Sequence, residues 1–249
     1  MATPQREIKT PIKSRILSET TPSPKTPRTP KTPVDSTIKR RISDILVNLH
    51  KCVQIWERDN QSSFNTANTL VNLYSQWNTV QESDSLNNLI TSDCKEKYKL
   101  KMLLTREDLL KQLKTHKEKL TNLISKMNSF KDNIRAIFYL GIVSKDVDTS
   151  ISSEANTSQE EFDYVPIVFN TWTVEMFLHT IEKMLSSYTK EYIVKMKFYK
   201  LFFDFRVSKS KEGDTSKLTN CISIWLHQPY IDDKCKFYLD SMLVEAELK

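Results

Sequence analysis

Apolar residues return every three or four positions along most of the chain after residue 37, which is the spacing of one face of an α-helix. The clearest run alternates steps of four and three, at Leu109, Leu113, His116, Leu120, Leu123, Met127, Phe130, Ile134 and Ile137. A repeat sustained over about four heptads is typical of coiled-coil-like pairing between long helices. His116 occupies a core position of this run. We interpret it as a polar residue that is tolerated at the helix seam and fixes register, in preference to a metal ligand.

A first helix is predicted directly after Asp35-Ser36, whose side chains suit an N-cap. Its apolar face is formed by Ile38, Ile42, Ile45, Leu49, Cys52 and Trp56. Asp59-Asn60 is expected to loosen this helix. The stretch that follows has its own apolar face, at Phe64, Ala67, Val71, Tyr74 and Trp77.

The second half of the chain has the same helical pattern. A long helix is predicted from Thr173, and Gly213-Asp214 is expected to break it. A shorter helix follows and must end near residues 226–228, because Pro229 cannot continue it. Asp232-Asp233 is expected to cap the last helix. The apolar face of that helix is formed by Cys235, Leu239, Met242 and Ala246.

Two polar segments, at about 81–93 and 144–161, are predicted to be loops. The segment "DYVPIVFNTW" from Asp163 is predicted to be extended, because Pro166 disfavours helical backbone at the residue before it. No alternation typical of β-strands competes with the helical pattern. The sequence therefore predicts an all-α protein, in which residues 37–249 form a long antiparallel coiled-coil-like helical bundle that serves as an interaction domain.

Residues 1–36 have no apolar period and are predicted to be a disordered tail. Ten Lys or Arg residues against three acids lie in residues 1–41, so the net charge of +6 belongs to this end and the rest is near neutral. Seven Ser/Thr-Pro dipeptides make the tail a candidate substrate of proline-directed kinases, at Thr3, Thr10, Thr21, Ser23, Thr26, Thr29 and Thr32. Each phosphate adds about −1.5 to −2 charge. A passive tail, or a basic arm attracted to nucleic acid, is the alternative interpretation.

The glycine and cysteine content limits the classes of protein that are compatible with this sequence. The chain has two glycines, Gly141 and Gly213, too few for the loops that cradle phosphates or present a nucleophile at a sharp turn. Its four cysteines lie far apart, and residues 1–36 hold no apolar signal-peptide segment, so reduced intracellular thiols are expected. The longest apolar stretch, at 134–143, is about half of what crosses a bilayer. We expect a soluble intracellular protein with no membrane partner.

No catalytic residue, cofactor or metal site is predicted. The nearest approaches to zinc-ligand spacing are His50 with Cys52, and Cys221 with His227 and Cys235, and neither matches a known pattern. No thiol or hydroxyl has a base placed beside it by a local motif. The near-neutral body and the aromatic residues on apolar helical faces argue against a dedicated nucleic-acid groove.

The remaining candidate is the corner "WLHQPY". Trp225 and Tyr230 flank the bend at Pro229, and each has an apolar body with a polar tip. Such residues anchor interfaces to other proteins about as often as they hold a helix corner within one domain. Trp225, His227, Pro229 and Tyr230 are therefore predicted to be partner-binding or corner residues, and the pattern alone leaves both readings open.

The segment "SIWLHQPYIDDKCKFYLDSMLVEAE" from Ser223 resembles the end of the cyclin-dependent kinase 2-interacting protein family. Weaker similarities occur upstream in the same order, at Trp56, at "SFNTANTLVNL" from Ser63, at "FNTW" from Phe169, and at Leu185 with Tyr188 and Glu191. The resemblance covers about residues 40–249. It departs at the tail, which is longer and richer in Ser/Thr-Pro, so no regulatory site is carried over there.

The resemblance implies a non-enzymatic nuclear adaptor with no catalytic residues to transfer. It implies a subunit of an AAA-type ATPase assembly, with a helical companion subunit, in large ribosomal subunit maturation and in DNA replication and replisome turnover. The alternative that it implies is a factor that binds cyclin-dependent and origin-firing kinases, in replication-origin control and the DNA-damage checkpoint. The family motif falls on the corner, so His227 is expected to form hydrogen bonds there and not to act as an acid or base.

Overall fold

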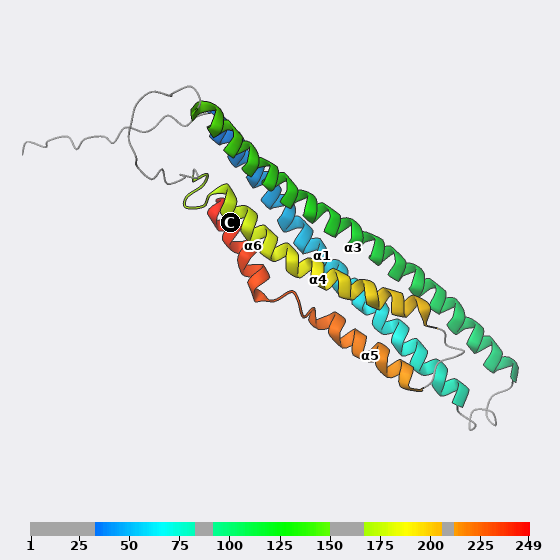
Figure 1. Ribbon diagram of the computed structural model, residues 1–249. Helices are drawn as coiled ribbons and strands as arrows, with labels where there is room; N and C mark the ends of the chain where they lie inside the picture. The colour runs from blue at the N-terminus through cyan, green and yellow to red at the C-terminus, as the bar shows by residue number, and fades with distance from the viewer. Residues whose placement is uncertain (1–32, 83–91, 150–166, 206–211) are drawn as a thin grey trace, which may run out of the picture. The chain divides into compact units, whose positions relative to one another are not determined.

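The computed structural model describes residues 33–82, 92–149, 167–205 and 212–249 (Figure 1). The seven candidate phosphorylation sites of the tail lie outside the described residues, and so do most residues of the predicted loops at 81–93 and 144–161. The described residues form the helices α1 (Pro33–Glu82), α3 (Ser92–Thr149), α4 (Val174–Asp204), α5 (Glu212–His227) and α6 (Asp233–Glu245). The predicted all-α class is confirmed.

These helices form an antiparallel bundle of four columns. In Figure 1 the chain runs one way along α1, returns along α3, runs forward again along α4 and returns along α5 and then α6. α3 packs against α1 and α4, and α5 and α6 pack against the same two helices from the other side. The fourth column is thus made of two short helices with a corner between them. The antiparallel helical bundle predicted from the sequence is confirmed.

The core of the bundle lies on the apolar faces that the helical spacing predicts. The α3 run is buried at Leu109, Leu113, Leu120, Leu123, Met127, Ile134 and Ile137. The predicted face of α6 is buried as well, at Cys235, Leu239, Met242 and Ala246. Burial of apolar area stabilises the fold by about 25 cal/mol per Å², so these faces decide which side of each helix is directed to the core.

Capping residues account for the start of two helices. Thr173 precedes α4, and its side chain accepts the N–H of Met176 at 3.3 Å. Asp232 precedes α6 and accepts the N–H of Cys235 at 3.3 Å. Both satisfy an N–H group that the first helical turn leaves without a partner. The predicted start at Thr173 and the predicted cap at Asp232 are therefore confirmed.

The first helix differs from the prediction at two points. It begins at Pro33, so Asp35 and Ser36 lie within its first turn instead of preceding it. Proline is well suited to that first position, because its missing N–H would have no helical partner there. Asp59-Asn60 does not loosen the helix, since α1 continues without a break to Glu82.

Other boundaries also move. α3 continues to Thr149, which is inside the segment predicted to be a loop from 144. Gly213 and Asp214 lie in the first turn of α5 and not between helices, because α4 has already ended at Asp204. A single glycine costs a helix only about 1 kcal/mol, which packing elsewhere along the helix outweighs.

The described part of the "DYVPIVFNTW" segment makes a tight turn before α4. Ile167 and Thr173 form an isolated antiparallel bridge, and the N–H of Val168 donates to the carbonyl of Trp172 at 3.0 Å. The prediction of extended backbone before Ile167 concerns residues outside the described ranges. Among the helices that the structure describes, none is long and apolar enough to cross a membrane.

Candidate functional site

The corner between α5 and α6 has an unusual backbone. α5 ends at His227, as predicted, and the next residue, Gln228, has a positive φ of 43°. Its N–H donates to the carbonyl of Ile224 at 3.1 Å, and its own carbonyl accepts the N–H of Ile231 at 2.9 Å. A left-handed residue just after a helix commonly ends it, but glycine is the usual choice. A side chain at this position therefore needs another reason to be there.

A hydrogen bond to α1 supplies that reason. Trp56 is fully buried, and its Nε1–H donates to the Oε1 atom of Gln228 at 2.8 Å. The Trp56 ring also meets Tyr188 of α4 edge-on, with ring centroids 5.1 Å apart. Left-handed backbone costs a non-glycine residue about 1–2 kcal/mol, and pairing the buried indole N–H offsets that cost. The corner is thereby tied to the neighbouring helix α1.

Substitution of Gln228 separates these two effects. We expect Gln228→Ala to lower the free energy of unfolding by about 1–3 kcal/mol, because the Trp56 N–H loses its acceptor while the backbone strain remains. Gln228→Gly loses the same acceptor but relieves the strain, so it should cost less. Urea denaturation followed by circular dichroism measures both variants. An alanine variant as stable as the wild type would mean that the bond to Trp56 contributes little.

A buried ion pair on α4 lies directly beneath the corner. Glu191 and Lys195 are 0% and 1% exposed, and the Lys195 Nζ atom lies 3.4 Å from Glu191 Oε1. Glu191 Oε2 accepts the N–H of Tyr230 at 3.3 Å, a group that the helix break at Pro229 has released. Lys195 Nζ donates to the carbonyl of Trp225 at 3.5 Å. The pair thus satisfies one backbone group on each side of the corner.

Lys195 has two further contacts. Its Nζ atom donates to Asn60 Oδ1 of α1 at 2.6 Å and lies 5.0 Å from the centre of the Trp225 ring. Burial lowers the pKa of Lys195 to about 8, and the charges of Glu191 and Asp59 oppose that change without cancelling it. The ammonium is therefore held in the core by its partners at a real cost in desolvation.

His116 of α3 belongs to the same level of the bundle. Its Nδ1 atom lies 2.8 Å from Asp59 Oδ1, and both side chains are about nine-tenths buried. The predicted role of His116 as a polar seam residue agrees with this placement, since its partner is a side chain on the neighbouring helix. We use the term polar layer for Asp59, Asn60, His116, Glu191 and Lys195, which join α1, α3 and α4 below the corner.

The predicted corner residues divide into two groups. Trp225 is fully buried and packs edge-on against Tyr199, with ring centroids 4.9 Å apart. His227, Pro229 and Tyr230 are exposed, and the exposed fraction of Tyr230 is 44%. Trp225 therefore belongs to the core of this chain, and only the other three are accessible to a partner.

The cysteines and histidines considered for zinc lie in ordinary helical positions. Cys52 and Cys235 are buried, His227 is exposed, and burial raises the pKa of the thiols of Cys52, Cys221 and Cys235. Within the described ranges no cluster of three or more His, Cys, Asp or Glu side chains could hold a metal ion.

Sequence comparison supports the resemblance that the corner motif suggested. The chain is 28% identical to human cyclin-dependent kinase 2-interacting protein over 212 residues, which cover 85% of this chain and 90% of that protein. The Xenopus laevis protein of the same name is 29% identical over 220 residues, and the Bos taurus protein is 26% identical over 212, each with the same coverage. The chain is thus similar to the cyclin-dependent kinase 2-interacting proteins over most of its length. No family model matches it.

The motifs that carry the resemblance to cyclin-dependent kinase 2-interacting proteins meet in the structure. Trp56 bonds the corner, Glu191 bonds the backbone of Tyr230, and Ser63, which opens "SFNTANTLVNL", is buried on α1 beside the polar layer's Asn60. Motifs that are far apart in the sequence therefore lie together at the corner and the polar layer.

The "FNTW" motif is held by the end of the last helix. The carboxylate of Glu245 accepts the backbone N–H groups of Thr171 and Trp172, the latter at 2.8 Å, and the Thr171 hydroxyl at 3.0 Å. Slight burial opposes ionisation, but these hydrogen bonds outweigh it and lower the pKa of Glu245. Trp172 and Phe169 both pack on Phe177, with ring centroids 5.1 and 5.3 Å away.

The sequence contains a signal for the polar layer that a search for apolar periodicity does not detect. The buried line of α4 passes through Ile181, Met184, Tyr188, Glu191, Lys195, Tyr199 and Phe202. The apolar period by itself favours Tyr192 and Met196 as the continuation of this face, but both are only partly buried. A Glu and a Lys four residues apart on the seam of a helix indicate a paired buried site, because neither residue is buried alone.

Proposed function

We propose that this protein is a non-enzymatic helical adaptor that binds a cyclin-dependent kinase. The observation that carries the proposal is the relation to proteins named for interaction with such a kinase, which extends over 85% of the chain. The buried polar residues Asn60, Glu191 and Lys195 bond other parts of this bundle, which suits a binding role. We further propose that it works in the nucleus, in replication-origin control and the DNA-damage checkpoint, and that the Ser/Thr-Pro tail is a substrate of the bound kinase.

A second proposal is a subunit of an AAA-type ATPase assembly in large ribosomal subunit maturation and replisome turnover. The observation that favours it is an exposed apolar surface at the start of α3, which a helical companion subunit would cover. The exposed fractions of Leu100, Leu103 and Leu104 are 59%, 43% and 61%. Farther along α3 the equivalent outward positions, seven residues on from Leu100 and Leu104, are Glu107 and Lys111. Apolar residues around most of a helix are typical of a helix that is covered.

Affinity purification with mass spectrometry, on the full chain and on two surface variants, tests both proposals. The first variant, Leu226→Ser/Tyr230→Ala, changes the accessible corner, where the exposed fractions are 46% and 44%. The second, Leu100→Ser/Leu104→Ser, changes the α3 surface. Trp225 is left intact in both, because its loss would disturb the core.

We expect the wild type to recover a cyclin-dependent kinase and the corner variant to recover less than about a tenth as much, the effect of losing one well-packed interface residue. Selective loss of an ATPase from the α3 variant would support the second proposal. A wild-type protein that recovers neither partner, and shows no binding to purified cyclin-dependent kinase, would contradict both. Circular dichroism of each variant confirms that the bundle remains folded.

A further inference from the structure

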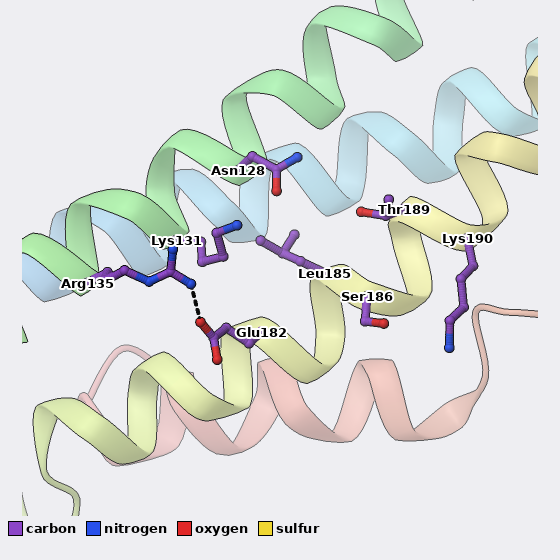
Figure 2. Close-up of a pocket in the computed structure, with 8 residues that line it drawn as sticks. All are labelled: Asn128, Lys131, Arg135, Glu182, Leu185, Ser186, Thr189 and Lys190. Carbon is purple, nitrogen blue, oxygen red and sulfur yellow. Dashed lines mark hydrogen bonds and ion pairs between the residues drawn. The ribbon is translucent and has the colours of Figure 1, made fainter.

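A groove between α3 and α4 has no role in the corner or the polar layer. It has a volume of about 440 Å³ and is lined by Asn128, Lys131, Arg135, Glu182, Leu185, Ser186, Thr189 and Lys190 (Figure 2). The α3 wall contributes an amide and two cations, and the α4 wall contributes two hydroxyls, one cation and one carboxylate. The lining therefore has an excess of two positive charges, together with several hydrogen-bond donors.

Lys131 is the residue that the groove leaves incompletely paired. Its side chain is only 23% exposed, and its ion pair among the described residues is with Asp132, at a long 3.6 Å. Two other lysines of α3 and α4 have partners across the bundle. Lys117 lies over the ring of Phe203 at 5.9 Å, and Lys195 has close partners on three sides. An anion in the groove would give Lys131 the partner that the fold does not supply.

Arg135 sits beside Lys131 and is only partly neutralised. Its Nη2 atom bonds Glu182 Oε1 at 2.5 Å, while Nη1 lies 3.6 Å from Asp132. Figure 2 shows this pair at one end of the groove, with Asn128, Lys131 and Thr189 facing the space between the helices and Lys190 pointing away from the pair. The groove thus brings two cations, an amide and a hydroxyl to one place.

We propose that this groove binds the phosphate of a phosphoserine or phosphothreonine in a partner peptide. A phosphate carries about −1.5 to −2 charge and three acceptor oxygens, so it can accept from the two cations, the amide and the hydroxyl that face the groove more completely than a single carboxylate can. Clusters of Lys and Arg are a recurrent means of recognising phosphorylated motifs. The lining that the structure describes holds no ring on which a nucleobase would stack, which favours a peptide over a nucleotide. This inference goes beyond kinase binding and does not depend on it.

Fluorescence polarisation with a labelled phosphothreonine peptide library tests the proposal on the full chain. We expect saturable binding that weakens as salt is raised, and no binding of the same peptides without phosphate. Lys131→Gln and Arg135→Gln should each weaken binding by about tenfold or more, the effect of losing one charge-assisted hydrogen bond. Lys114→Gln is the matched control, since Lys114 is an exposed cation on α3 outside the groove and should change binding less than about twofold.

Glu182→Gln provides a test in the opposite direction. This change removes the carboxylate that competes for Arg135, so we expect phosphopeptides to bind several-fold more tightly. A gain of affinity cannot result from misfolding. Binding that is equal in all four variants and the wild type would overturn the proposal. So would peptides that bind no tighter than inorganic phosphate, an outcome that would leave an adventitious ion only.

Discussion

Replacing Trp225 by alanine is expected to lower the free energy of unfolding by about 3–5 kcal/mol. The indole is fully buried among Tyr199, Phe202 and Phe198, with ring centroids 4.9, 6.0 and 6.1 Å away. Its removal would leave a cavity that rigid helices cannot fill. It would also remove the ring that lies against the ammonium of Lys195. Chemical denaturation followed by circular dichroism measures the loss.

Tyr230→Ala is the matched control for that experiment. Tyr230 lies five residues away in the same motif, but it is 44% exposed, and its contact with Glu191 is through the backbone N–H, which alanine retains. We expect this variant to lose less than about 1 kcal/mol. If both variants were equally stable, Trp225 would not be part of the core. Reduced partner binding by Trp225→Ala would therefore report on folding, whereas reduced binding by Tyr230→Ala would report on the surface.

Breaking the buried ion pair should have an effect of similar size. We expect Lys195→Met or Glu191→Leu alone to destabilise the protein by about 3–5 kcal/mol, because each leaves an unpaired charge in the core. The double variant removes both charges and should cost clearly less than the sum of the two single changes. It will not be neutral, since Asn60, Trp225 and Tyr230 also lose a hydrogen-bond partner. A double-mutant cycle in urea measures the coupling.

The pH dependence of stability tests whether the ammonium of Lys195 is destabilised by its burial. Its pKa is about 8 in the folded protein against 10.5 when unfolded, so the unfolded chain binds more protons between these values. The stability of the wild type relative to Lys195→Met should therefore be lowest below pH 8 and increase by about 2–3 kcal/mol towards pH 10.

Other buried groups act in the opposite direction but cancel in that comparison. Burial raises the pKa of Cys52, Cys235, Tyr188 and Tyr199, so the folded state holds these protons longer than the unfolded chain. Their effect lowers stability at alkaline pH equally in the wild type and in Lys195→Met. A difference between the two proteins that does not change with pH would mean that Lys195 titrates normally in the fold.

The corner combines a structural role with an accessible surface. Its inner side is held by Trp56, Glu191 and Lys195, and its outer side presents His227, Pro229 and Tyr230. A rigid exposed turn of this kind is a suitable anchor for a partner, because binding would require little further ordering. The two interpretations that the corner motif left open are therefore compatible.

Helical periodicity was sufficient to predict most of this fold. The apolar steps of four and three along residues 109–137 predicted a long paired helix, and nearly all of those positions are buried. Asp232 predicts a helix start because a short polar side chain can satisfy a free N–H group within its own turn, and the helical spacing predicts the start at Thr173. Pro229 predicted the end of α5, because it cannot donate a helical hydrogen bond. All of these effects act within a few residues of each other.

Periodicity failed where polar residues occupy the seam. The pattern predicts that Asn60 loosens the first helix, and it favours the apolar neighbours of Glu191 and Lys195 as core positions, but all three polar residues are buried. Each of these residues is unfavourable in the core by itself. Lys195 is 135 residues from its partner Asn60 and 30 residues from its partner Trp225. Boundaries such as that at Gly213 moved for a related reason, since packing along a long helix outweighs a local preference.

The amino-acid sequence by itself thus determined the helical class, the apolar faces and the position of the corner, because these depend on short-range backbone chemistry and on the period of the helix. The tertiary structure alone decided that Trp225 points inward, that Gln228 is held by Trp56, and that the seam residues of α1, α3 and α4 form one polar layer. Burying a charge is favourable only when its partners are already in place. Those partners come together only once the helices have packed.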